Sequence, residues 1–201
     1  MSTESSAADA KRFISANELS TLAEELAYKI AKDYCFPSFM IVLWRGGCQP
    51  GSVVQEFLEY VNDRAPIDHV AVRTVSRNPY TGTPLPEIQV HAIGHAVATL
   101  KASDTLLIVD DVWDSGRSIH AVLNYLKKAL GDDMPQTVKV ATVFYKPKKN
   151  KFPQGPDYYV EATDAWLVFP HELVELNDEE VKLYRPNAYA LAQKFNKEDR
   201  V

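Results

Sequence analysis

The chain lacks three features that would each assign it to a broad class of protein. Its 201 residues include only two cysteines, Cys35 and Cys48, too few for a disulfide framework and without the spacing of metal ligands. Basic residues are not in excess, and the net charge of -5 argues against a general nucleic-acid surface, so any bound anion must be held by a local site. No apolar run reaches about 18 residues, and the N-terminus MSTESSAADAKR has no apolar signal core. We therefore expect a cytoplasmic protein with neither a nucleic-acid nor a membrane partner.

The composition is that of one globular α/β domain. Hydrophobic residues make up 46% of the chain, which is enough for a full core, and 201 residues would be cramped for two complete domains. We expect residues 1–14 to form a polar N-terminal tail and residues 15–201 to form a single domain.

Short β-rich runs alternate with amphipathic stretches along most of the chain. Strands are predicted at 39–44, 69–75, 87–93, 105–111 and 139–146. Helices are predicted near 19–30, 53–61, 119–130 and 187–196. The stretch 76–86 contains three prolines and a glycine and is expected to be a long mobile loop. Strands that alternate with helices predict an α/β fold with a parallel sheet flanked by helices, whose ligands bind beyond the carboxyl ends of the strands.

The richest chemistry lies in the stretch LLIVDDVWDSGRS, residues 106–118. A buried strand is expected to end on Asp110 and Asp111, and residues 115–118 occupy the turn into the next helix. Exposed amides at a helix N-terminus suit a phosphate monoester, and Gly116 lets the backbone approach it closely. The two carboxylates suit sugar hydroxyls, directly or through a divalent cation. The stretch predicts a site for a phosphorylated sugar in preference to a solvated turn with ordinary helix caps.

This stretch resembles the ribose 5-phosphate signature of the type I phosphoribosyltransferases, which is an apolar strand, two acidic residues and then D-T/S-G-x-T/S. The resemblance implies a Rossmann-like fold in which Asp110 and Asp111 bind the 2′ and 3′ hydroxyls of phosphoribosyl pyrophosphate (PRPP). Asp114 would lie near the incoming base nitrogen as a proton acceptor. The 5′-phosphate would be held by Ser115, Gly116, Arg117 and Ser118, with Arg117 at the variable position.

The segment LWRGG, residues 43–47, fits the order of the same family. It offers a cation, Arg45, and the close-approach amides of Gly46 and Gly47 to a second anion. The matching loop of the family grips pyrophosphate, often through a cis peptide. We expect that peptide between Trp44 and Arg45.

The proline-rich stretch 76–86 matches the flexible flap of the family in its place along the chain. Such a flap excludes water from a reactive ribosyl centre. By resemblance, Ser76 and Arg77 would meet the pyrophosphate.

The last third of the chain should select the base. In the purine enzymes of the family a lysine follows the fifth strand, and Lys146 in FYKP would donate to a purine 6-oxo group. DAWLVFPHE, residues 164–172, resembles the hood of xanthine–guanine and hypoxanthine enzymes. Trp166 would stack on the base, the Leu167 backbone would read its edge, and Glu172 would sit near ring position 2 or a metal-bound water. Residues 146–175 would form most of a small hood subdomain. His171 stands where the family usually has tryptophan, so the choice among xanthine, guanine and hypoxanthine stays open.

The resemblance as a whole implies a purine phosphoribosyltransferase of purine salvage, which converts a base and PRPP to a nucleoside 5′-monophosphate and pyrophosphate. Its cofactor would be Mg2+, held by Asp110, Asp111 and, partly through water, Glu172. A homodimer or homotetramer is usual for the family. Two alternatives stay open, namely a regulatory protein of the same fold that binds PRPP or a nucleotide, and a phosphoribosyltransferase for a different base.

The remaining histidines and the basic run are interpreted as structural or surface residues. His69, His91, His95 and His120 form no recognised metal motif, although the pair in HAIGH, residues 91–95, merits a test for metal. The run KPKKNK, residues 146–151, is interpreted as a solvated loop beyond Lys146.

Overall fold

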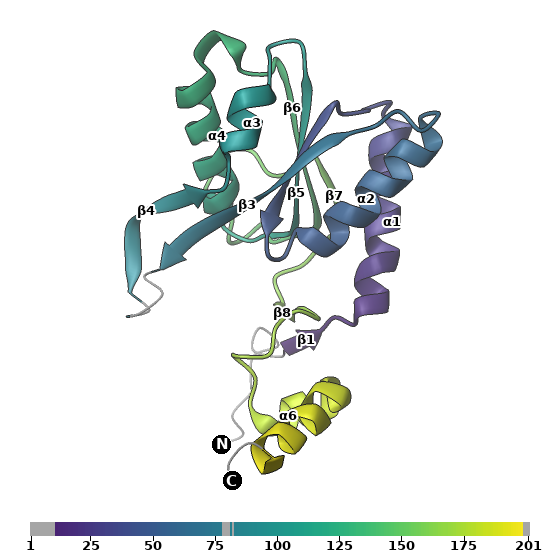
Figure 1. Cartoon of the computed structure of the whole chain (residues 1–201), viewed down its shortest axis with the longest axis vertical. Coiled ribbons are helices and arrows are strands. Elements are labelled where there is room, and N and C mark those ends of the chain that lie inside the picture. The colour runs from purple at the N-terminus through teal and green to yellow at the C-terminus, as the bar shows by residue number, and fades with distance from the viewer. Residues whose placement is uncertain (1–10, 78–80, 82, 199–201) are drawn as a thin grey trace, which may run out of the picture. The chain divides into compact units, whose positions relative to one another are not determined.

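The computed structural model of the chain describes residues 11–77, 81 and 83–198, and the side chains of residues 77, 84 and 196–198 fall outside this description. The chain divides into two compact units, one of residues 17–164 and one of residues 1–16 with 165–201. Figure 1 shows the elements of both units. The expectation that residues 15–201 form a single domain with a hood at 146–175 stays a prediction.

A six-stranded sheet forms the centre of the larger unit, in the strand order β4-β3-β2-β5-β6-β7. The strands are β2 (Phe39–Trp44), β3 (Asp68–Arg77), β4 (Pro84–His91), β5 (Thr105–Trp113), β6 (Thr137–Tyr145) and β7 (Tyr158–Ala162). Each neighbouring pair is parallel except β3 with β4, which is antiparallel. The predicted α/β fold is confirmed, with one antiparallel strand at the edge of an otherwise parallel sheet.

Helices cover both faces of this sheet. They are α1 (Ala16–Lys32), α2 (Cys48–Val61), α3 (Gly94–Thr99) and α4 (Arg117–Leu130), and α4 runs into a 3-10 turn at Gly131–Asp133. In Figure 1, α1 and α2 lie to one side of the sheet and α3 and α4 to the other. The sequence pattern of β2 explains both contacts, because Ile41 is buried in one cluster with residues of α4 while the adjacent Val42 touches Gly51 of α2. Successive side chains of a strand point to opposite faces, so an uninterrupted apolar run such as β2 is buried on both.

The hairpin between β3 and β4 replaces the long loop that the sequence predicts for residues 76–86. β3 runs to Arg77 and β4 begins at Pro84, so only the segment between them is a connection. Proline is tolerated in β4 because the strand lies at the edge of the sheet, where one row of amides needs no partner. The expected mobility of the stretch stays a prediction, because residues 78–80 and 82 lie outside the described residues.

The smaller unit contains a second, two-stranded sheet and two helices. Its elements are β1 (Lys11–Phe13), β8 (Trp166–Val168), α5 (Asp178–Tyr184) and α6 (Pro186–Glu198). β1 pairs with β8 in parallel, so the end of the segment expected to be a polar tail is a strand. Arg185 fastens the unit together, because its guanidinium donates to the carbonyl oxygens of Ile14 and Phe169 at 3.4 and 2.9 Å. None of the described helices is long and apolar enough to cross a membrane.

Candidate active site

The turn that follows β2 lies directly against the carboxyl end of β5. A Cβ atom on Gly46 would lie 2.3 Å from Oδ2 of Asp111, and one on Gly47 would lie 2.5 Å from the carbonyl oxygen of Val109. Only glycine permits this approach of one backbone to the other strand. The peptide bond between Trp44 and Arg45 is cis, which confirms the prediction from the sequence, and the Arg45 side chain is exposed. The fold therefore brings the segment 45–47 and the acidic pair to one place.

Asp110 is partly buried and Asp111 is buried, and both residues lie within β5. The strand continues to Trp113, two residues beyond its predicted end, so the pair lies inside the strand and not after it. Burial, together with the neighbouring Asp111 carboxyl, raises the pKa of Asp110 well above its ordinary value. The backbone amides of Asp111 and Gly47 oppose this rise by donating to the Asp110 carboxylate. Two adjacent buried acids favour a ligand that supplies hydroxyl donors or positive charge.

The acidic pair has the chemistry of a partial Mg2+ site. Within the described part of the chain, no group of three or more His, Cys, Asp and Glu residues could hold a metal ion. Magnesium is commonly bound through one or two carboxylates, with waters and substrate phosphates completing the set. Asp110 and Asp111 fit such a shared site, in which a bound phosphate ester would provide the other oxygens.

The turn between β5 and α4 forms an anion-binding arrangement. Gly116 is the N-cap of α4 and has φ of 78°, a left-handed conformation that favours glycine. A glycine offers no side-chain acceptor to the first amides of the helix, which leaves them available to a ligand. Asp110 and residues 112–119 line a pocket of about 80 Å3 at this turn. The predicted residues of the turn, 115–118, therefore all line one small cavity.

Asp114 and Lys146 come together beside this cavity. Oδ2 of Asp114 lies 3.5 Å from Nζ of Lys146, whose side chain is only 7% exposed. The Lys146 backbone amide donates to the carbonyl oxygen of Trp113 at 2.9 Å, which ties the end of β6 to the end of β5. This arrangement offers a ligand a buried cationic donor next to a half-exposed carboxylate.

The basic run 146–151 is a largely exposed loop beyond the buried Lys146, as the sequence predicts, but its side chains also make ion pairs near the site. Lys149 lies 3.7 Å from the same Oδ2 of Asp114, and Lys148 lies 3.1 Å from Asp164. The run folds back on itself because the amides of Lys149 and Asn150 donate to the Lys146 carbonyl oxygen at 3.1 and 3.2 Å. The site thus includes Lys149, a residue that the sequence reasoning missed. Its spacing of three residues from Lys146, one turn of a helix-like bend, is the signal that could have indicated it.

The two residues expected to act in the flap are described only in part. Ser76 is exposed on β3, at the point where the pairing of β3 with β4 shifts register between Val75 and Arg77. The side chain of Arg77 lies outside the described residues. The roles of both toward pyrophosphate stay predictions.

The expected base-stacking residues belong to the smaller unit. Trp166 is 55% exposed on β8, and Leu167 beside it is buried. Oε2 of Glu172 accepts a hydrogen bond from the Phe169 amide at 2.8 Å, and the His171 ring stacks on Phe169 with ring centroids 5.6 Å apart. Glu172 and His171 therefore both hold the turn that follows β8.

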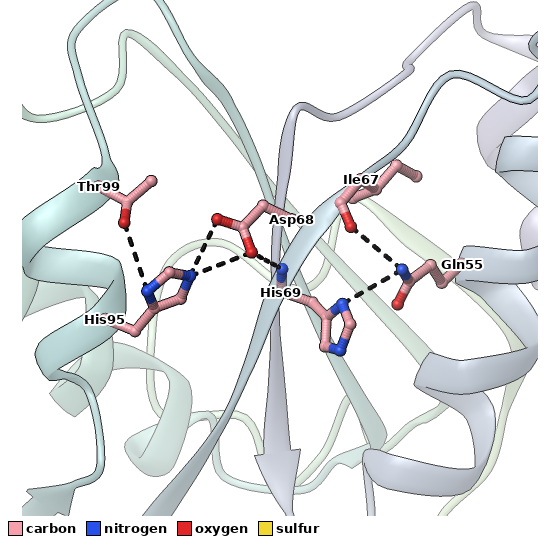
Figure 2. A network of polar contacts seen from close by, with 6 residues as sticks. All are labelled: Gln55, Ile67, Asp68, His69, His95 and Thr99. Carbon is pink, nitrogen blue, oxygen red and sulfur yellow. Dashed lines mark hydrogen bonds and ion pairs between the residues drawn. The ribbon is translucent and has the colours of Figure 1, made fainter.

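Three of the histidines outside this turn, His69, His95 and His120, make side-chain contacts within the fold. Figure 2 shows His95 of α3 facing Asp68 at the start of β3, while the His69 ring meets Gln55 of α2. His120 stacks on Phe152 with ring centroids 3.4 Å apart. The pair His91 and His95 belongs to no metal-ligating group within the residues that the structure describes.

Comparison with known proteins identifies the family. The family model described as the phosphoribosyl transferase domain matches residues 16–175. No protein with a curated description matches the chain. The solved structure of a purine phosphoribosyltransferase from Pyrococcus horikoshii is similar at 26% identity and a TM-score of 0.61, covering 83% of this chain and 97% of that one.

Two further solved structures share the fold at lower identity. A xanthine-guanine-hypoxanthine phosphoribosyltransferase from Helicobacter pylori is 20% identical, with a TM-score of 0.60 over 89% of this chain and 99% of its own. A hypothetical protein from Neisseria gonorrhoeae, solved with bound ppGpp, is 24% identical with a TM-score of 0.66 over 89% and 98% of the two chains. Because the family model spans most of the sequence and the fold agrees, the chain belongs to the phosphoribosyl transferase domain family and is a phosphoribosyltransferase.

Proposed function

We propose that this enzyme transfers ribose 5-phosphate from PRPP to a 6-oxopurine in purine salvage, giving the nucleoside 5′-monophosphate and pyrophosphate. The observation that carries the proposal is the buried Lys146 beside Asp114. A lysine ammonium only donates hydrogen bonds, so it suits an exocyclic oxygen and not an exocyclic amino group. Asp114 can accept the proton of a ring N–H on the same base. A 6-oxopurine presents both groups, whereas adenine presents an amino group at position 6.

The rest of the site is proposed to position PRPP. The amides of residues 115–118, which we call the phosphate loop, would hold the 5′-phosphate, and Asp110 and Asp111 would accept hydrogen bonds from the ribose hydroxyls. Arg45, with the amides of Gly46 and Gly47, would bind the pyrophosphate group. Catalysis would come from this positioning and from charge stabilisation as the pyrophosphate leaves.

Mg2+ is the proposed cofactor, held by Asp110 and Asp111, with Glu172 contributing through water. When bound, it would supply positive charge to the departing pyrophosphate. Trp166, with its half-exposed ring, is the proposed stacking surface for the base, with the Leu167 backbone reading the base edge. Ser76 and Arg77 are proposed to meet the pyrophosphate from the flap.

Pyrophosphate release with a panel of bases tests the proposal. Purified enzyme with PRPP and Mg2+ should release pyrophosphate with hypoxanthine, xanthine or guanine, and should be inactive with adenine and uracil. Release with uracil or adenine alone would instead favour the alternative of a different base. No release with any base, together with tight binding of PRPP or a nucleotide, would favour the regulatory alternative. Sedimentation velocity on the same sample tests the expected homodimer or homotetramer.

A further inference from the structure

We propose that Trp113 and Asn150 are positioning residues that couple the phosphate loop to Lys146 in the base site. The inference rests on the proposed function, in which the phosphate loop binds PRPP and Lys146 binds the base. It concerns two side chains to which the proposed function assigns no hydrogen bond with either ligand, although Trp113 is among the residues that line the cavity at the loop. They join two segments that are distant in the sequence, one after β5 and one after β6.

The indole ring of Trp113 lies directly beneath the phosphate loop. It is 2% exposed, and a Cβ atom on Gly116 would lie 2.7 Å from three of its atoms, including Nε1. The same ring meets His120 of α4 edge-on, with centroids 5.8 Å apart, and His120 in turn stacks on Phe152. The ring therefore supports the loop backbone from below and contacts the first turn of α4 that follows it.

The indole N–H reaches across to the segment after β6. Nε1 of Trp113 donates to Oδ1 of Asn150 at 3.1 Å, and that oxygen also accepts from the Phe152 amide at 3.1 Å. Nδ2 of Asn150 lies 3.0 to 3.1 Å from the Tyr145 hydroxyl and from the carbonyl oxygens of Phe152 and Gln154. An amide side chain alone supplies both the acceptor and the donors that these partners require.

Two backbone hydrogen bonds close the connection on either side of the indole. The Lys146 amide donates to the Trp113 carbonyl oxygen at 2.9 Å, and the Lys151 amide donates to the Ser115 carbonyl oxygen at 3.2 Å. The bend that begins at Lys146 is thus fixed at one end to the last residue of β5 and at the other end to the phosphate loop, with the Trp113–Asn150 bond between them. The position of Lys146 relative to the phosphate loop is therefore set by these three hydrogen bonds.

Two substitutions of Trp113 separate the support that its ring gives to the phosphate loop from the hydrogen bond that its N–H donates to Asn150. Trp113→Phe keeps an aromatic ring under Gly116 but removes the N–H donor to Asn150. We expect it to raise KM for the base about fivefold, the effect of one lost hydrogen bond, and to change KM for PRPP less than about twofold. Trp113→Ala removes the ring as well, and should raise KM for PRPP about tenfold or more because the loop loses its support.

Asn150→Ala removes the same hydrogen bond from the side of its acceptor. It should raise KM for the base, and Trp113→Phe added to it should have no further effect, because Asn150→Ala has already removed the acceptor of the indole N–H. Lys148→Ala is the matched control on the same bend. Lys148 is 83% exposed and pairs with Asp164, so its loss should leave both KM values within twofold, roughly.

Each outcome decides the inference. An unchanged KM for the base in Trp113→Phe, or equal rises in both KM values, would overturn it, as would additive effects in the double variant. If the wild-type enzyme releases no pyrophosphate with any base, the proposed function fails, and calorimetric affinity for ribose 5-phosphate decides the inference separately. Weaker binding in Trp113→Ala than in Trp113→Phe then supports the loop-supporting role of the ring. Equal affinity of the two variants for ribose 5-phosphate would overturn that role, even if Trp113→Ala is less stable than the wild type.

Discussion

The ammonium of Lys146 lies 3.5 Å from Oδ2 of Asp114, with the lysine side chain 7% exposed and the aspartate 44% exposed. The backbone amide of the lysine donates to the Trp113 carbonyl oxygen at the end of β5, and the aspartate is among the residues that line the cavity at the β5–α4 turn. A base that enters this site displaces neither group, because Lys146 has further donor protons and Asp114 has a second oxygen.

Lys146→Ala should weaken the use of hypoxanthine, xanthine and guanine alike. It removes a charged donor to the proposed 6-oxo group, and the loss of such a bond lowers kcat/KM by roughly 10- to 100-fold. Lys149→Ala is the matched control, because Lys149 is 54% exposed and lies 3.7 Å from the same Asp114 oxygen. It should lower kcat/KM by less than about fivefold, as expected for an exposed ion pair. Steady-state kinetics with the three bases checks both. Equal efficiency of Lys146→Ala and wild type with all three would contradict the role of Lys146.

Asp114→Asn should keep PRPP binding and lower turnover. Asparagine has nearly the same shape, but it cannot accept a proton from the base, and loss of general base catalysis lowers kcat by about 10²- to 10⁴-fold. KM for PRPP should stay within about threefold, because the proposed PRPP contacts come from other groups. Single-turnover kinetics and PRPP titration separate the two effects. Unchanged turnover in the variant would remove Asp114 from the chemistry.

Gly46→Ala should disrupt PRPP binding, while Gly94→Ala should not. The added methyl group at position 46 would lie 2.3 Å from the Asp111 carboxylate, whereas position 94, at the start of α3, has no atom within 4 Å. The first variant should raise KM for PRPP about tenfold or more because the turn must move away from the acidic pair. The second should leave kinetics unchanged and raise Tm slightly, since alanine is favoured over glycine in helices by up to about 1 kcal/mol. Similar kinetics for the two variants would show that the close approach of the turn to Asp111 has no functional role.

The sequence predicts the parts of the fold and site that local pattern determines. The apolar run of β2, the acidic pair and the turn 115–118 all lie in strand–turn–helix units whose residues are neighbours in the chain. The cis peptide between Trp44 and Arg45 is predicted by the resemblance of the segment LWRGG to the matching loop of the family.

Contacts between distant segments explain what the sequence did not predict. β1 is three residues long and forms by pairing with β8, more than 150 residues later, so no local pattern indicates it. Lys149 and Asn150 acquire their contacts only because the segment after β6 bends back under the end of β5. The prolines of β4 are typical of loops, and only the position of the strand at the sheet edge reconciles them with a hairpin.

A last relationship concerns stability and lies at the opposite end of β3 from the site. Nε2 of His95 lies 3.0 and 2.9 Å from the two carboxylate oxygens of Asp68, and the His69 amide donates to the same carboxylate at 2.8 Å (Figure 2). These contacts, first the hydrogen bond from His95, lower the pKa of Asp68 below its ordinary value. They join α3 to the first residue of β3.

Asp68→Asn should therefore destabilise the protein at neutral pH and not in acid. A carboxyl whose pKa is lowered by folding stabilises the protein above its unfolded-state pKa, about 3.9, and this contribution is lost as the pH falls through the lower folded-state value. The difference in urea midpoint between wild type and Asp68→Asn should be constant from pH 7 to about pH 5 and should close below about pH 4. In a His95→Ala background the same substitution should have a much smaller effect, because the first cause of the lowered pKa is gone. A midpoint difference that persists unchanged in acid would mean that Asp68 acts through packing of β3 and not through its charge.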